Sequence, residues 1–143
     1  MRKQTLKFLP IVGSILFITG CIHTQPFIPK ALNEDAKGIT TVRSTPYGCK
    51  VLGEVEGKDA IPETSPNVKI VSRHKDVMRE GALNDLRNNA VTVTGKKNRI
   101  TLRIIDEKPI CRYSGLPNQD CPVDSRVSDA YIITAQIFEC GEK

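Results

Sequence analysis

The chain has 143 residues, of which 39% are apolar and 26% charged, and its formal net charge is +5. This length allows one domain besides whatever processing removes. Three of the positive charges, on Arg2, Lys3 and Lys7, belong to a segment that we expect to be cleaved, which leaves about +2 on the rest. So small a charge, with no tryptophan and few aromatic residues, argues against a nucleic-acid-binding protein.

The amino terminus has the pattern of an export signal. Its cations precede an apolar run over residues 8–18, which is too short to span a bilayer comfortably. The run ends in Ile18-Thr19-Gly20-Cys21, which resembles the bacterial lipobox with isoleucine in place of the usual leucine. The resemblance implies cleavage before Cys21 and its modification by lipid, including acyl groups such as palmitate, because several acyl chains give a stable anchor. The alternative is an ordinary signal peptide that ends by chance in a cysteine.

We therefore expect three parts: a signal peptide over residues 1–20, the lipidated Cys21 with a flexible tether over residues 21–38, and a periplasmic domain over residues 39–143. The tether contains two prolines and shows neither a helical nor a strand period. Because Ile22 is not aspartate, the enteric sorting rule predicts the outer membrane, with the domain in the periplasm.

The first half of the domain favours strands. Residues 39–44 are rich in β-formers, and residues 49–56 alternate in the manner of a half-buried strand. Gly53, inside that strand, could mark a bulge or a place where a helix packs closely. Residues 57–66 have the composition of a loop, and residues 68–71 predict a short edge strand.

Residues 76–90 are the one long segment with a clear helical period. Asp76 is the predicted N-cap, because its carboxylate accepts from free backbone N–H groups. The β-branched residues 91–94 and then Gly95 predict that the helix ends at Ala90. Apolar residues at steps of three and four form one stripe that should be buried: Met78, Ala82, Leu83, Leu86 and Ala90.

The second half predicts a strand over residues 99–105, a long polar loop over residues 106–128 and a last strand over residues 130–140. The last strand is apolar on both faces, which favours the interior of a sheet. The predicted fold class is α+β: a small, mostly antiparallel sheet of three to five strands, with one amphipathic helix on one face, stapled by disulfides.

Four cysteines remain once Cys21 is taken as the anchor. An even number in an exported chain indicates two disulfides. We prefer Cys111–Cys121, because both lie in the long loop, and Cys49–Cys140, because each belongs to a strand end. The crossed pairing, Cys49–Cys121 with Cys111–Cys140, stays open.

We expect no metal or other cofactor and no enzymatic activity. No two cysteines are spaced as CxxC, and the two histidines lie in the tether and in a loop, so a zinc site is weakly supported. The chain also lacks a Gly-rich phosphate loop, an HExxH motif and a GxSxG motif. No nucleophile is paired with a base.

The cysteine strand, the helix and the last strand together resemble domain-of-unknown-function family 4156, a group of small bacterial lipoproteins. The resemblance covers roughly residues 46–140, and the family cysteines match Cys49 and Cys140, which favours that pairing. The run at 91–98 departs from the Ala-rich continuation usual in the family. The layout is also similar, more distantly, to the Rcs-type outer-membrane stress-sensor lipoproteins. The matching residues are Cys49, Leu52, Gly53, Gly81, Ala82, Asn84, Asp85, Leu86, Arg87, Asn88, Ala90, Phe138 and Cys140.

The expected role is that of a membrane-anchored binding or envelope stress-sensing module. The alternative is a structural accessory lipoprotein of a larger envelope complex. The polar side of the helix carries the candidate interaction face, Asn84, Asp85, Arg87 and Asn88. Either the asparagines bond neighbouring loops while Asp85 and Arg87 are solvated, or the four residues recognise an envelope protein.

Overall fold

The computed structural model describes residues 20–63, 67–71, 73–95, 99–113 and 116–141. It shows the expected α+β fold, with a mostly antiparallel sheet and two disulfides. The predicted signal peptide lies almost wholly outside the described residues. The elements are β1 (His23–Pro26), η1 (Glu34–Ala36), β2 (Thr40–Val42), β3 (Cys49–Ala60), β4 (Val68–Val71), α1 (Lys75–Thr94), β5 (Ile100–Tyr113), β6 (Leu116–Asp120) and β7 (Ala130–Cys140).

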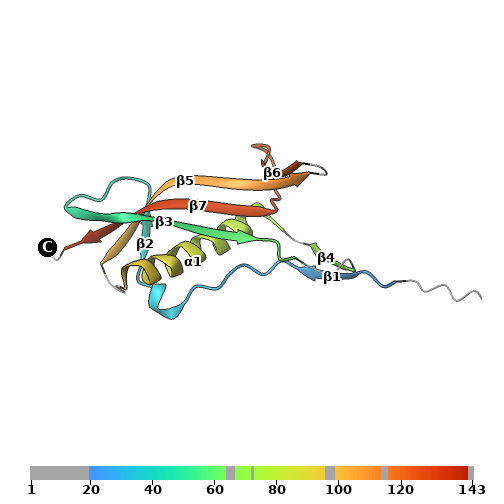
Figure 1. Ribbon diagram of the computed structural model, residues 1–143, viewed down its shortest axis with the longest axis horizontal. Coiled ribbons are helices and arrows are strands. Elements are labelled where there is room, and N and C mark those ends of the chain that lie inside the picture. The colour runs from blue at the N-terminus through green and yellow to red at the C-terminus, as the bar shows by residue number, and fades with distance from the viewer. Residues whose placement is uncertain (1–19, 64–66, 72, 96–98, 114–115, 142–143) are drawn as a thin grey trace, which may run out of the picture.

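The main sheet has the strand order β2-β5-β7-β3, and β6 extends it by pairing with β5 (Figure 1). The last strand, β7, is antiparallel to both of its neighbours, β3 and β5. Its predicted place in the interior of the sheet is confirmed. The short strand β2 runs parallel to β5, and β1 and β4 form a separate parallel pair.

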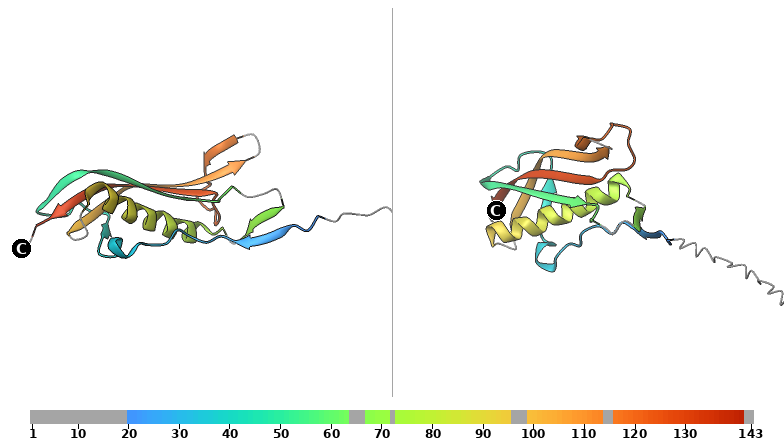
Figure 2. Two further views of the ribbon diagram at one scale, coloured as in Figure 1. Left: turned by 60° about the horizontal axis from the view of Figure 1, so that its bottom comes forward. Right: turned by 45° about the vertical axis from the view of Figure 1, so that its right-hand side comes forward.

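The helix α1 lies across one face of this sheet (Figure 2). The predicted apolar stripe faces the sheet, although Leu83 is only partly buried. The helix packs mainly over β3 and β7. The fully buried side chains of the helix are Met78, Ala82, Leu86 and Ala90, and those of the strands include Leu102, Ile133, Ala135 and Ile137.

Both ends of the helix differ from the prediction. His74 is the N-cap residue, and Asp76 lies in the first turn without capping it. At the other end the helix continues for four residues past Ala90, to Thr94. The Thr94 hydroxyl donates to the carbonyl oxygen of Ala90 at 2.8 Å, so the hydroxyl of this β-branched residue has a hydrogen-bond partner within the helix. Helix propensity is a weak preference that packing overrides, and the stop is Gly95, whose φ of 63° suits a left-handed cap.

The strand β3 runs four residues beyond its predicted end at Glu56. The pairing with β7 shifts register between Val51 and Gly53, which agrees with the first of the two alternatives for Gly53, a bulge. Close packing against the helix occurs at Gly57 instead. A Cβ atom there would overlap the carbonyl oxygen of Ala82 and the amide nitrogen of Leu86. Composition predicts a loop at Gly57, but of the two described glycines of β3 it is the one where helix and sheet approach more tightly.

Replacing Gly57 by alanine should therefore lower the free energy of unfolding by about 1 to 3 kcal/mol, the range for an overpacked interior. The added methyl group meets helix backbone, which cannot move aside without shifting α1. Urea unfolding followed by circular dichroism measures the loss. Gly141→Ala is the matched control, because a Cβ there meets nothing within 4 Å. Equal stability of the two variants would contradict the close approach.

The long loop predicted over residues 106–128 is largely strand. β5 continues to Tyr113, and β6 returns antiparallel to it. Pro109 is tolerated because it falls between the part of β5 that pairs with β2 and the part that pairs with β6. The Cys111–Cys121 disulfide joins β5 to the residue after β6.

Both preferred disulfides are present, and the crossed pairing is not. Cys49 and Cys140 face each other in the β3–β7 register, with their Cα atoms 4.2 Å apart. The Cα atoms of Cys111 and Cys121 are 4.9 Å apart. Both separations lie close to the range that disulfides span.

The segment expected to be a flexible tether is held against the domain. Its β1 strand pairs with β4, and Phe27, Ala36 and Ile39 are buried. We call residues 27–39 the strap. The expectation of a flexible tether over residues 21–38 therefore does not hold for the strap. Single buried apolar residues and side-chain hydrogen bonds hold it in place, and these leave no helical or strand period in the sequence.

Candidate functional site

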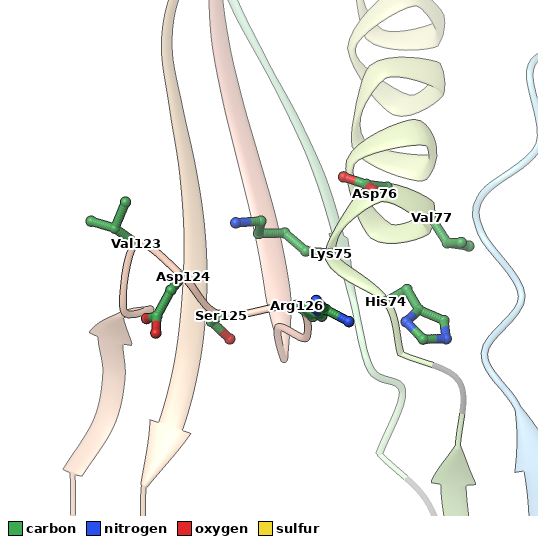
Figure 3. Close-up of a pocket in the computed structure, with 8 residues that line it drawn as sticks. All are labelled: His74, Lys75, Asp76, Val77, Val123, Asp124, Ser125 and Arg126. Carbon is green, nitrogen blue, oxygen red and sulfur yellow. The ribbon is translucent and has the colours of Figure 1, made fainter.

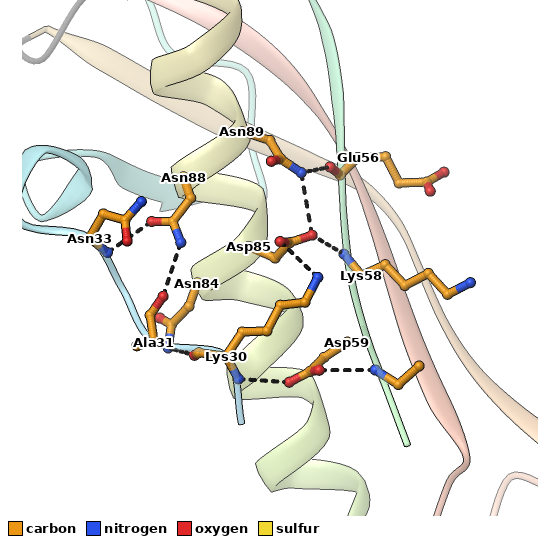
Figure 4. A network of polar contacts seen from close by, with 11 residues as sticks. Lys30, Ala31, Asn33, Glu56, Lys58, Asp59, Asn84, Asp85, Asn88 and Asn89 are labelled. Atoms are coloured by element: carbon orange, nitrogen blue, oxygen red, sulfur yellow. Dashed lines mark hydrogen bonds and ion pairs between the residues drawn. The ribbon is translucent and has the colours of Figure 1, made fainter. Parts of the chain in front are cut away.

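Two asparagines of the helix hold the strap (Figure 4). The Asn84 amide donates to the carbonyl oxygen of Lys30 at 2.9 Å, and the Asn88 amide donates to that of Ala31 at 2.9 Å. The Asn88 amide oxygen also accepts from the backbone N–H of Asn33 at 2.9 Å. Backbone groups of an irregular segment need such partners, so these bonds replace the ladder of a strand.

Asp85 and Asn89 connect the helix to the edge strand. One oxygen of Asp85 accepts from the Lys30 ammonium group at 2.9 Å, and the other accepts from the backbone N–H of Lys58 at 2.8 Å. Asn89 donates to the carbonyl oxygen of Glu56 at 2.9 Å. Because β3 lies at the edge of the sheet, its outward backbone groups lack a strand partner. The helix side chains cap two of them.

These contacts bear on the two interpretations of the predicted interaction face. Asn84, Asp85 and Asn88 are engaged within the domain, which favours the first interpretation for the asparagines and shows that Asp85 is not simply solvated. Arg87 is separate from them: its side chain is half-buried, and its Nε has no hydrogen-bond partner among the described residues. The four residues do not form one free surface.

Asp59, for which composition predicts a loop, is the buried carboxylate of this network. It is 4% exposed and accepts from the backbone N–H groups of Lys30 and Ala60, both at 2.9 Å. Burial raises the pKa of Asp59, although those two bonds act in the opposite direction. Gly81 makes room for it, because a Cβ at Gly81 would overlap the Asp59 carboxylate. A glycine in the middle of a helix was the one sequence signal of such an approach.

A second polar cluster lies on the other side of the helix, around Glu107. Arg79 donates to both oxygens of this carboxylate, at 2.9 and 2.6 Å. The Tyr131 hydroxyl donates at 3.1 Å and Arg43 at 3.2 Å. Hydrogen bonding from Arg79 lowers the pKa of Glu107, and burial raises the pKa of Tyr131. With three residues donating to it, the carboxylate is fixed as a structural acceptor.

Replacing Glu107 by glutamine should lower stability most at neutral pH, by about 2 to 3 kcal/mol, because Arg79 loses its charged partner. The folded-state pKa of Glu107 lies below its ordinary value of 4.5. Its contribution is therefore fully present above that value and is lost as the pH falls through the folded-state pKa. The difference between wild type and variant should shrink in urea unfolding curves as the pH falls below 4.5.

The matched control is Glu80→Gln, which changes an exposed helix carboxylate and should alter stability little at any pH. A difference between wild type and Glu107→Gln that stays constant across the pH range would contradict the lowered pKa.

A depression of about 590 Å³ lies between the start of α1 and the loop after β6 (Figure 3). It is wide open to solvent. Its cations, Lys75 and Arg126, are accompanied by the carboxylates of Asp76 and Asp124. These opposite charges do not concentrate a field of one sign. Another depression, of about 470 Å³, has Glu107 on its wall.

The start of β3 and the end of β7 lie at the opposite end of the molecule from β1 (Figure 1), and exposed apolar residues occur at this start of β3. The Tyr47 side chain is fully exposed, and Val51 and Leu52 are 49% and 38% exposed. We call these three residues the disulfide-end surface, because Cys49 lies between them. In this half of β3, no described helix side chain is seen to cap the outward backbone groups, in contrast to Glu56 and Lys58.

Other kinds of site have little support in the part of the chain that the structure describes. There, no three histidine, cysteine or acidic side chains come together in a way that could hold a metal ion. Over the same residues, no helix has the length and apolarity needed to cross a membrane. Cys21 is exposed and outside both disulfides.

Comparison with known proteins found no matching family model, curated protein or solved structure. Membership of family 4156 therefore stays a prediction that rests on the sequence motifs. The structure itself shows a small disulfide-bonded α+β domain. Side chains of its helix hold the amino-terminal strap by hydrogen bonds.

Proposed function

We propose that the chain is a lipoprotein, anchored in the outer membrane through Cys21, whose periplasmic domain acts by binding a protein of the cell envelope. The basic and apolar segment that ends in Gly20-Cys21 supports the anchor. Among the described cysteines Cys21 alone is outside a disulfide, so its thiol is available for the lipid. Resemblance to family 4156 and the two disulfides agree with an oxidising envelope compartment.

The observation that carries the binding role is the disulfide-end surface. Tyrosine is enriched in protein interfaces, because its ring buries apolar area while its hydroxyl keeps a polar partner. Here the fully exposed Tyr47 lies in the turn just before β3, and two partly exposed aliphatic residues follow on the strand, whose first residue, Cys49, is disulfide-bonded. A preorganised surface of this kind loses little conformational entropy on association.

The polar clusters support binding over catalysis. Glu107 accepts from three residues and Asp59 from two backbone N–H groups, so both carboxylates serve the fold. A general base needs a carboxylate that can reach a substrate proton. Within binding, a stress-sensing module and a structural accessory of a larger envelope complex are distinguished by stoichiometry: conditional capture supports the sensor, and a stable stoichiometric complex supports the accessory.

The test is crosslinking in cells followed by pulldown from membranes. The wild type is compared with Cys21→Ser and with the double variant Tyr47→Ser, Leu52→Ser. Val123→Ser is the matched control, because Val123 is an exposed apolar residue of the loop near the start of α1. We expect one envelope partner with the wild type and the control, and capture reduced by about tenfold or more with the double variant, as for central interface residues.

Two results would contradict the proposal. If the double variant, with an unchanged melting temperature, captures the partner as well as the wild type, the disulfide-end surface is not the contact. If no partner is captured and Cys21→Ser behaves as the wild type does, anchoring is incidental, and soluble-ligand and enzymatic roles must be reopened.

A further inference from the structure

The anchor and the domain are separated by almost no chain. β1 begins at His23, two residues after Cys21. Two residues of extended chain span at most about 7 Å. The headgroup layer of one leaflet, taken as half the difference between the whole bilayer and its hydrocarbon core, is about 5 to 8 Å thick. An acylated Cys21 therefore brings the start of β1 to the outer margin of the headgroups.

The β1–β4 pair is itself fixed to the domain. Backbone bonds close it at both ends, from His23 N–H to the Asn67 carbonyl oxygen at 2.8 Å and from Phe27 N–H to that of Val71 at 2.9 Å. Phe27 is buried in the main core, and Ile70 packs against that core. Residues 23–26 pair with β4, and the strap that follows is hydrogen-bonded to the helix at Lys30 and Ala31. The described chain between the anchor and the core is therefore held to the domain.

The exposed side chains of this end suit a headgroup layer. Ile22, 69% exposed, lies next to Cys21, where an apolar side chain can enter the membrane interface. Every residue of β1 is exposed, and so is Lys69 of β4. A lysine at this depth keeps its ammonium group among phosphate groups.

We infer that the β1–β4 pair lies against the lipid headgroups of the leaflet that holds the acyl chains of Cys21. This inference rests on the proposed anchoring and gives the domain an orientation. The β1 end of the domain contacts the headgroups. The start of β3, which carries the disulfide-end surface, then points away from the bilayer (Figure 1). β3 runs from that surface back to the β1 end, because Ala60 and Gln25 line one depression. Its length between Lys50 and Ala60 is about 33 Å.

The test uses two lysines of the native sequence as reporters. The mature acylated protein is placed in vesicles that contain phosphatidylglycerol, and its amines are labelled with a water-soluble acylating reagent. Peptide mass spectrometry compares the labelling rates of Lys69 and Lys50 with those of soluble Cys21→Ser protein. A surface potential of about −30 to −50 mV concentrates protons near the headgroups and should slow labelling of Lys69 by about 3- to 7-fold.

Lys50, at the far end of β3, lies several Debye lengths from the headgroups in this orientation, so its rate should not change. Slowing of Lys69 alone supports the inference. Equal rates at Lys69 in vesicles and in solution, on a protein whose amino-terminal peptide carries the acyl mass, would overturn the orientation and leave the anchoring intact. Slowing of Lys50 alone would reverse the orientation. An unacylated amino-terminal peptide would overturn the proposed anchoring itself.

Discussion

Replacing Cys49 and Cys140 together by alanine should lower the free energy of unfolding by about 4 to 5 kcal/mol in the chain-entropy description of a crosslink. The bond joins residues 91 apart in sequence. Without it the unfolded chain regains the freedom of that long loop. Because small domains have a total stability of only about 5 to 15 kcal/mol, this loss removes a large part of it. Urea unfolding at 25 °C, followed by circular dichroism, measures the change.

The comparison is with Cys111→Ala, Cys121→Ala. That bond closes a separation of 10 residues and should contribute about 2.5 to 3 kcal/mol. Each variant keeps the other disulfide and leaves no unpaired thiol in the domain. If the first variant is unfolded in buffer, the series is repeated in sucrose, which strengthens burial for all three proteins. Equal losses from the two variants would show that loop length does not set the ranking.

Replacing Leu86 by alanine should cost about 2 to 5 kcal/mol, the range for a leucine truncated in a well-packed core. Leu86 is fully buried at the centre of the helix stripe, and its backbone lies directly over Gly57. Both elements are held in place, the helix by the strap bonds and the strand by β7. The site therefore cannot collapse easily around the missing atoms, and most of the cavity should remain.

The matched control is Val93→Ala on the same helix. Val93 is 64% exposed, so the substitution removes little buried area and improves helix propensity. Its effect should stay within about half a kcal/mol. A loss that small for Leu86→Ala would mean that the helix does not bury this face.

The elements that could be predicted from the sequence are those in which the spacing of apolar residues indicates which face is buried. The stripe of Met78, Ala82, Leu86 and Ala90 placed the helix on the sheet, and the apolar residues on both faces of 130–140 placed β7 in its interior. The positions of the cysteines, at strand ends and in one long connection, favoured the two disulfides that are present but left the crossed pairing open.

Prediction from the sequence failed where partners distant in sequence determine the structure. Gly57 and Asp59 have a loop composition, yet one lets the helix approach and the other is satisfied by the strap. Glu107 and Pro109 suggested a polar loop, but Arg79 pairs with the first and a change of neighbouring strand accommodates the second. Such compensation has no period along the chain, so only the folded arrangement reveals it.

We call the hydrogen bonds of Asn84, Asp85 and Asn88 to the strap and to β3 the clamp; it bears on how related chains should be compared. Asn84, Asp85 and Asn88 hold backbone groups of two other segments, so a chain that keeps the strap needs these side chains for folding alone. Invariance at those positions would record selection on the fold, and a relative without the strap would be released from it. Substitutions at Tyr47 and Leu52, which leave the clamp untouched, are the ones that should follow a change of partner.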